Sequence, residues 1–290
     1  MKVAVPKEIV EGERRVALVP HTAAGLVKLG VEVLVESGAG EAASFPNRLY
    51  EEEGVTIVSN AADLYEAADV VLKVEKPVAN EDLGLHEVEL MSEGTVLCTF
   101  LQPLTNLELV QHLADKRITS FSMDAIPRIA RAQSMDALTS MASLAGYKAA
   151  LIAANSLGRF LPMMVTAAGT FAPAKGLVLG AGVAGLQSIA TARRIGAVMS
   201  AYDVRLAAKE QVESLGASFI EAQIDEEAEG AGGYAKELAQ ESQERERELI
   251  HRHIRDMDFV ITTAAIPGRR APVLITEEMV KDMRDGSVIV

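Results

Sequence analysis

One stretch in the second half of the chain decides its fold: Lys175-Gly176-Leu177-Val178-Leu179-Gly180-Ala181-Gly182-Val183-Ala184-Gly185. Residues 175–179 form an apolar run with the length of a buried strand, and three glycines follow in the pattern G-x-G-x-x-G. Residues 186–195 continue as a helical pattern, and residues 198–202 are the next apolar run. This order of strand, glycine-rich turn, helix and strand predicts a βαβ unit with parallel strands.

Each of the three glycines is expected to have its own role in such a unit. Gly180 permits the tight turn that leaves the strand. Gly182 lets a pyrophosphate approach the backbone N–H groups at the start of the helix, where Val183 is the first helical residue. Gly185 lets the helix pack closely against the strand. The pattern therefore predicts a dinucleotide-binding loop.

Asp203 ends the second strand of this unit, at about the expected 20 residues beyond the glycines. A carboxylate at this position accepts hydrogen bonds from the adenosine ribose hydroxyls and repels a 2′-phosphate. The sequence therefore predicts NAD(H) as the cofactor in preference to NADP(H). Arg205, two residues further on, is close enough to weaken this preference, but we interpret it first as a surface arginine.

Short apolar runs alternate with helical patterns along the whole chain, and this alternation predicts an α/β fold with two Rossmann-like domains and mostly parallel sheets. The expected strands are residues 2–5, 31–36, 55–58, 70–74, 96–100 and 118–123 in the first half, and 176–179, 198–203, 218–221, 259–262 and 287–290 in the second. The expected helices of the first half are residues 22–29, 61–67 and 106–116.

A long helical pattern over residues 134–157 is predicted to join the two domains. One face carries small residues, and these let another backbone approach closely: Ala142, Ala145, Gly146 and Ala149. A second face carries large apolar residues, which we interpret as core packing: Met135, Leu138, Met141, Leu144 and Leu151. We expect an N-terminal α/β domain (1–133), a linking helix (134–165) and a Rossmann domain (166–290). Because residues 287–290 end the sequence inside a predicted strand, we also expect a further C-terminal segment.

Composition excludes several classes of function. The chain has 290 residues and a formal net charge of −13, which argues against a nucleic-acid partner because phosphate binding requires clustered Lys and Arg. The single cysteine, Cys98, lies in an apolar run and is interpreted as a buried core residue. No secretory signal and no run long enough to span a bilayer is seen, so we expect a cytoplasmic location without a transmembrane segment in this chain.

Two loops of the second half are further candidates. Residues 262–268 follow a strand at the carboxyl edge of the sheet, where ligands bind, and Ala265 is predicted to lie beside the nucleotide; an ordinary Pro-Gly turn explains the same residues equally well. Residues 224–248 are acidic and polar, with Gly232, Gly233 and Tyr234 together. Such a long loop is typical of a functional or a solvated segment.

Several segments together resemble one superfamily. They are Val5-Pro6-Lys7-Glu8 and residues 14–20, 36–40, 71–74 and 266–290. The superfamily contains alanine dehydrogenase and the NAD(H)-binding α subunit component (domain I) of proton-translocating NAD(P) transhydrogenase. The resemblance covers the whole chain, and it implies that the 232–237 segment is a mobile loop in which Tyr234 closes over the nucleotide. It also implies that the expected C-terminal segment returns to complete the first domain.

The alanine dehydrogenase branch implies a site that this sequence matches only at some positions. Arg15 and Lys73 match the arginine and lysine that hold the substrate carboxylate in that branch. The position of its proton-transferring histidine is Gln102 here, and glutamine cannot titrate. Amino-acid dehydrogenation moves protons as well as a hydride, so Gln102 argues against this branch.

The transhydrogenase branch is matched by Pro127-Arg128-Ile129-Ala130-Arg131-Ala132-Gln133-Ser134-Met135-Asp136, which resembles its loop beside the nicotinamide. The resemblance implies that Arg128 and Asp136 hold the nicotinamide and its carboxamide, which has donor and acceptor groups. It also implies that Gln133 reaches toward a second nucleotide and that the Thr139 hydroxyl replaces a serine of the family. The alternative is a charged helix start with Asp136 in its first turn.

The resemblance gives the leading hypothesis: a peripheral component, homodimeric, that holds NAD(H) and transfers hydride to or from NADP(H) held on a partner component. A membrane-spanning component would couple the transfer to proton translocation and would place this chain at the membrane surface. Two alternatives stay open from the sequence, an alanine-type amino-acid dehydrogenase and a non-catalytic NAD-binding module.

Overall fold

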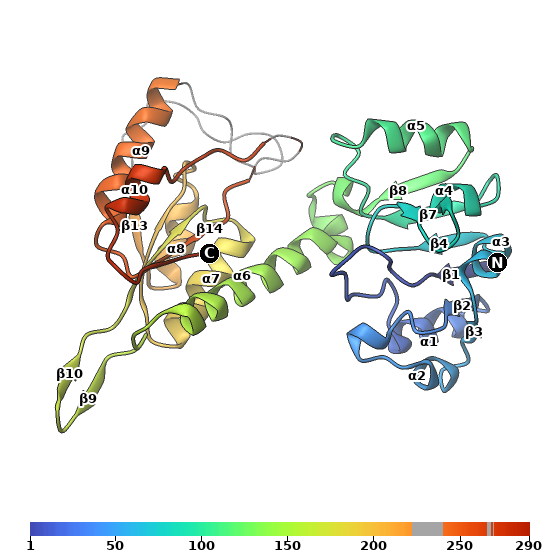
Figure 1. The fold of residues 1–290 in the computed structure, drawn as a ribbon, viewed down its shortest axis with the longest axis horizontal. Coiled ribbons are helices and arrows are strands. Elements are labelled where there is room, and N and C mark those ends of the chain that lie inside the picture. Colours follow the sequence, from blue (N-terminus) through green and yellow to red (C-terminus); the bar gives the residue numbers. More distant parts are fainter. Residues whose placement is uncertain (222–239, 266–267, 269) are drawn as a thin grey trace. The chain divides into compact units, whose positions relative to one another are not determined.

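The computed structural model of the chain describes residues 1–221, 240–265, 268 and 270–290. The described chain divides into two compact units, Met1–Asp136 and Ala137–Val290. Figure 1 shows that each unit is built around a sheet with helices packed on it. The predicted α/β fold with two parallel-sheet domains is confirmed.

Unit 1 contains a six-stranded sheet in the order β3-β2-β1-β4-β7-β8, and every neighbouring pair is parallel. Its strands are β1 (Lys2–Val5), β2 (Glu32–Glu36), β3 (Thr56–Val58), β4 (Val70–Leu72), β7 (Val96–Thr99) and β8 (Thr119–Ser122). Its helices are α1 (Pro20–Lys28), α2 (Asn47–Glu51), α3 (Ala61–Ala67), α4 (Glu87–Leu90) and α5 (Leu107–Asp115). Alternate residues of β1 point to opposite faces, so Ala4 lies in one apolar core and Val5 in the other.

Unit 2 contains a five-stranded parallel sheet in the order β13-β12-β11-β14-β15. Its strands are β11 (Lys175–Leu179), β12 (Val198–Tyr202), β13 (Ser218–Ile220), β14 (Phe259–Thr262) and β15 (Val288–Ile289). Its helices are α6 (Ala137–Ser156), α7 (Val183–Arg194), α8 (Ala208–Ser214), α9 (Gln240–Ile254) and α10 (Glu277–Lys281). Val178 and Leu179 belong to the cores on the two faces of this sheet.

All the strands predicted from apolar runs are present in these two sheets. Two antiparallel pairs were not predicted, β5 (Ala79–Asn80) with β6 (Leu85–His86) and the hairpin β9 (Met164–Thr166) with β10 (Gly169–Phe171). Every residue of the β9–β10 strands is exposed. An exposed hairpin buries no face, so it leaves no apolar alternation in the sequence.

Helix α6 packs against α7 at Gly146, which is one of the four small residues of the predicted face; of the other three, Ala145 is exposed and Ala142 and Ala149 are only partly buried. The residues it buries are Gly146, Ala150 and Ala153. The interpretation of the large apolar face as core packing is wrong for two of its members, because Leu144 is 58% exposed and Met135, just before the helix, is 55% exposed. By length and composition alone α6 could also cross a membrane, a test that core helices of soluble proteins pass too.

The strand order reverses next to the first strand of each sheet, between β1 and β4 in unit 1 and between β11 and β14 in unit 2. In open parallel sheets, ligands bind at the carboxyl ends of the strands at such a point. The fold therefore predicts two candidate ligand-binding crevices, one in each unit, at the point where the strand order of its sheet reverses.

Candidate nucleotide-binding site

The crevice of unit 2 is formed by the loops that follow β11 and β14. Gly180 has a φ of +95°, which is the conformation expected for the tight turn. The Thr263 hydroxyl donates to the Gly180 carbonyl at 2.7 Å, and the Thr263 N–H donates to the Leu179 carbonyl at 2.9 Å. A Cβ at Gly180 would lie 2.9 Å from the backbone nitrogen of Ala264. The two loops are therefore in direct contact.

The other two glycines of the loop differ in what surrounds them. A Cβ at Gly182 would meet no heavy atom within 4 Å among the described residues, whereas a Cβ at Gly185 would lie 1.9 Å from the Gly180 carbonyl oxygen. Gly182 is the N-cap of α7, a helix whose residues are all described and which has no side-chain cap and no acidic residue in its first turn. The first N–H groups of α7, from Val183 onward, therefore have no side-chain cap and no carboxylate of the first turn beside them, and such a helix start suits an anion.

Asp203 lies directly after β12 and is 8% exposed. Its Oδ2 accepts the N–H of Ala181 in the glycine loop at 2.7 Å. Arg205 donates to the same carboxylate from its backbone N–H at 2.8 Å, from Nε at 2.9 Å and from one terminal nitrogen at 2.8 Å. The Arg205 side chain is only 19% exposed. Its interpretation as a surface arginine is therefore wrong, because the turn after β12 folds the guanidinium back onto Asp203.

A second carboxyl group lies next to Asp203, and the sequence did not reveal it. Glu246 of α9 is 6% exposed, and burial raises its pKa above the ordinary value. Burial, followed by the charge of Glu246, raises the pKa of the neighbouring Tyr202 phenol well above its usual range. The polar stretch that contains Glu246 was interpreted as a loop; the signal available was the apolar spacing of Leu249, Ile250 and Ile254, which pack on the sheet.

Two further residues, Ala265 and Tyr234, are predicted to lie at this crevice. Ala265 is exposed and follows Ala264 in the loop that contacts Gly180. Its position at the carboxyl edge agrees with the prediction and does not separate a nucleotide contact from an ordinary turn. Tyr234 lies outside the described residues.

The loop predicted to lie beside the nicotinamide belongs to unit 1 and follows β8. Arg128 and Gln133 are exposed, and Asp136 is partly buried. Residues Ala130–Met135 form a 3₁₀ helix that is anchored by the buried Ala132. Thr139, partly buried, lies in the first turn of α6 and belongs to unit 2. Asp136 precedes the first residue of α6.

The crevice of unit 1 is occupied by the chain's own charged side chains. Lys73, directly after β4, donates to Glu87 at 2.8 Å and pairs with Glu8 at 3.2 Å. The Tyr65 hydroxyl also donates to Glu87, at 2.7 Å. The side chains of Lys73, Glu8 and Glu87 are 1%, 4% and 2% exposed. Burial, the largest effect, raises the pKa of Glu8 in spite of the nearby ammonium group.

Comparison with models of known protein families identifies the family to which the chain belongs. Residues 4–145 match the model described as "Alanine dehydrogenase/PNT, N-terminal domain", and residues 149–290 match "Alanine dehydrogenase/PNT, C-terminal domain". The chain belongs to the alanine dehydrogenase/PNT family.

Both branches of this family are among the similar proteins. The chain is 52% identical to an NAD(P) transhydrogenase subunit alpha protein of Rhodospirillum rubrum, over 100% of this chain and 76% of that protein. It is 30% identical to alanine dehydrogenase of Bacillus subtilis, over 100% of this chain and 70% of that protein. The crystal structure of transhydrogenase from Sinorhizobium meliloti matches with a TM-score of 0.87 and 45% identity, over 100% of this chain and 77% of that chain.

Arg15, Lys73 and Gln102 are the three positions at which the sequence was compared with the alanine dehydrogenase branch of this family. Arg15 donates to Glu13 at 2.9 and 2.5 Å and to Glu75 at 3.1 Å, and its hydrogen bond, the largest effect, lowers the pKa of Glu13 to about 2. Gln102 has a φ of +49°, a conformation that is uncommon for a residue with a side chain. In this structure Lys73 and Arg15 are each paired with carboxylates of the chain itself.

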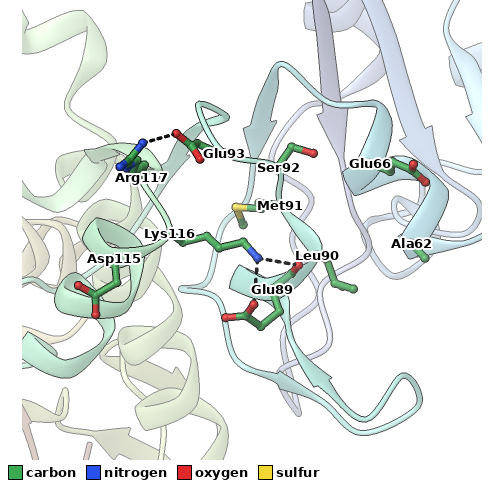
Figure 2. Close-up of a pocket in the computed structure, with 10 residues that line it drawn as sticks. All are labelled: Ala62, Glu66, Glu89, Leu90, Met91, Ser92, Glu93, Asp115, Lys116 and Arg117. Carbon is green, nitrogen blue, oxygen red and sulfur yellow. Dashed lines mark hydrogen bonds and ion pairs between the residues drawn. The ribbon is translucent and has the colours of Figure 1, made fainter.

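A separate surface depression of about 850 Å³ lies in unit 1. Figure 2 shows its lining, in which Lys116 pairs with Glu89 at 2.9 Å and Arg117 with Glu93 at 2.7 Å. Carboxylates of the lining thus neutralise its two cations, and further acidic residues such as Glu66 add negative charge. An anionic dinucleotide does not suit this depression, and the features that do suit one belong to the glycine loop of unit 2.

Proposed function

We propose that this chain is the NAD(H)-binding component of a proton-translocating NAD(P) transhydrogenase. It holds NAD(H) in the crevice of unit 2 and exchanges hydride with NADP(H) held on a partner component. The observation that carries the proposal is the open first turn of α7 at Gly182 beside the buried Asp203, in a chain whose relatives include transhydrogenase α subunits.

The described residues of unit 2 fit the chemistry of NAD(H). The pyrophosphate would be held by the N–H groups that begin α7, where the helix dipole favours negative charge. Asp203 is the acceptor for the ribose hydroxyls, and its charge disfavours a 2′-phosphate. NAD(H) supplies the hydride; the chain's own role is to bind, orient and exclude water.

At the nicotinamide end we assign Arg128 and Asp136 to the nicotinamide and its carboxamide, and the Thr139 hydroxyl to the same group. Gln133, exposed on the 3₁₀ helix, is assigned to the face that meets the partner's nucleotide. Hydride transfer between two nicotinamides requires the reacting atoms about 3–3.5 Å apart and no proton carrier. A glutamine at position 102 is compatible with this reaction, whereas an amino-acid dehydrogenase needs a titrating group there.

We further propose that the chain acts at the membrane surface through its partner components, as a homodimer. The name "subunit alpha" that several relatives carry supports the existence of further subunits. Exposed apolar side chains support a protein contact, among them Phe160, Met163 and Val165, which are 51%, 61% and 73% exposed. Sedimentation of the purified chain over a range of concentrations measures the oligomeric state, and a monomer throughout excludes the homodimer.

The proposed activity is tested by a hydride-transfer assay between NADPH and an NAD⁺ analogue, with the chain alone and with an NADP(H)-binding partner component. We expect turnover only when both are present. Oxidation of L-alanine by NAD⁺ with this chain alone would instead establish the amino-acid dehydrogenase. NADH binding without transfer in the presence of the partner would establish the non-catalytic module. Each hypothesis therefore has its own result.

A further inference from the structure

The carboxylate of Asp203 is saturated with hydrogen bonds from the chain itself. Oδ2 accepts from the Ala181 N–H and an Arg205 terminal nitrogen, and Oδ1 accepts from the Arg205 N–H and Nε. A carboxylate offers about four lone-pair sites, and four donors already use them. A ribose diol therefore cannot bind Asp203 until one of these donors leaves.

Only the two donors of the Arg205 guanidinium can leave without unfolding the site. The Ala181 N–H is part of the glycine loop, and the Arg205 N–H is part of the turn after β12, so both are fixed by the backbone. The Arg205 guanidinium is held by its flexible side chain, which is 19% exposed and so has a path to solvent. Moving it frees one acceptor site on each oxygen of Asp203.

We propose that Arg205 is a specificity-determining residue, whose guanidinium occupies the ribose-binding face of Asp203 and must be displaced by the adenosine ribose of NAD(H). This inference rests on the proposed function, because it takes the glycine-loop crevice as the NAD(H) site. Arg205 thus competes with the diol, and the competition weakens NAD(H) binding and favours release.

The displaced guanidinium also has a consequence for nucleotide selection. It stays tethered two residues from Asp203, close to the 2′ position of the ribose. An arginine there is the group that accommodates a 2′-phosphate, since its fork matches phosphate geometry. Arg205 is therefore expected to offset some of the repulsion that Asp203 exerts on NADP(H), so its removal should sharpen the preference for NAD(H).

The test is a fluorescence titration of the full chain with NADH and with NADPH. Arg205→Ala should bind NADH about fivefold more tightly, the size of effect typical of a partly exposed ion pair, and should bind NADPH more weakly than the unsubstituted chain. Arg205→Lys keeps the charge without the fork and should show a smaller gain for NADH. Arg194→Ala, an exposed arginine of α7, removes the same charge and should change neither affinity.

A second measurement keeps the inference testable if Arg205→Ala does not fold. The affinities of AMP and of 2′-deoxy-AMP are measured for the unsubstituted chain and for Arg205→Lys. These four affinities form a thermodynamic cycle, which gives the cost of losing the 2′-hydroxyl in each protein. Loss of the 2′-hydroxyl should cost more affinity in Arg205→Lys, because Asp203 is more available there. Weaker or unchanged NADH binding in Arg205→Ala, or equal costs in the cycle, overturns the inference.

The titrations contain no hydride transfer, and this separates the two proposals. A chain that binds NADH as described and never exchanges hydride with a partner refutes the proposed activity and leaves the role of Arg205 standing. A chain that binds neither NADH nor AMP, with or without the substitutions, refutes both.

Discussion

The carbonyl oxygen of Ala184 lies 2.1 Å from the position that a Cβ at Gly146 would occupy. The two residues belong to α6 and α7, and the Ser188 hydroxyl of α7 also donates to the Gly146 carbonyl at 3.0 Å. The helix that begins with the nucleotide loop is therefore held against α6 at a distance that only glycine permits.

Gly146→Ala is expected to destabilise unit 2 by about 1–3 kcal/mol, because the added methyl group must push the two backbones apart. Chemical denaturation of the full chain measures the change as a lower midpoint. Gly158→Ala is the matched control, since a Cβ there meets nothing within 4 Å among the described residues, and we expect a change within about 0.5 kcal/mol. Equal midpoints for the two variants would show that the helices can separate without cost.

Substitutions at Gly182 and Gly185 should separate nucleotide binding from folding. Gly182→Ala places its methyl group in open space, so the chain should keep its stability but bind NADH about tenfold more weakly, because the pyrophosphate can no longer approach the backbone. Gly185→Ala drives its methyl group into the Gly180 carbonyl and should lower the denaturation midpoint. Full NADH affinity in Gly182→Ala would mean that the pyrophosphate binds elsewhere.

The predictions that succeeded and those that failed differ in their physical basis. The strands and the glycine loop were predictable because apolar runs and the backbone freedom of glycine are local properties. The exposed face of α6 was not, because a helix with small and large apolar faces can bury either one, and the close approach of α7 to Gly146 decides between them.

The missed features of the site depend on tertiary contacts. Arg205 looks like a surface residue until the turn after β12 directs its guanidinium onto Asp203. Glu246 looks solvated until α9 packs against the sheet and buries it. Charged residues carry little positional information in a sequence, because their burial depends on partners that are distant in the chain.

The buried network of unit 1 makes a prediction about pH. Lys73→Met removes the ammonium group and leaves Glu8 and Glu87 as buried carboxylates without their cation, which is expected to cost about 3–5 kcal/mol at neutral pH. Thermal or chemical denaturation of the variant and of the unsubstituted chain measures this loss of stability. Lys116→Met is the control: its pair with Glu89 is solvent-exposed, so we expect a loss of about 0–1 kcal/mol.

The deficit of Lys73→Met should shrink as the pH falls. Burial raises the pKa of Glu8 in the folded chain above its ordinary value of 4.5, and loss of the lysine raises it further. A carboxyl whose folded pKa is raised takes up its proton before the unfolded chain does, so the penalty is present at high pH and disappears toward pH 4.5. A deficit independent of pH would indicate that lost packing, and not charge, causes it.

Gln133 provides the sharpest separation between binding NADH and transferring its hydride. It is exposed on the 3₁₀ helix Ala130–Met135, which the buried Ala132 anchors, so Gln133→Ala removes a carboxamide without disturbing the core. If Gln133 positions the partner's nucleotide, hydride transfer should fall about tenfold to a hundredfold, since small misplacements of reacting groups have effects of that size. NADH affinity should stay unchanged. Ser134→Ala, an exposed neighbour, should alter neither quantity. A parallel loss of NADH affinity would move Gln133 to the NAD(H) side of the transfer.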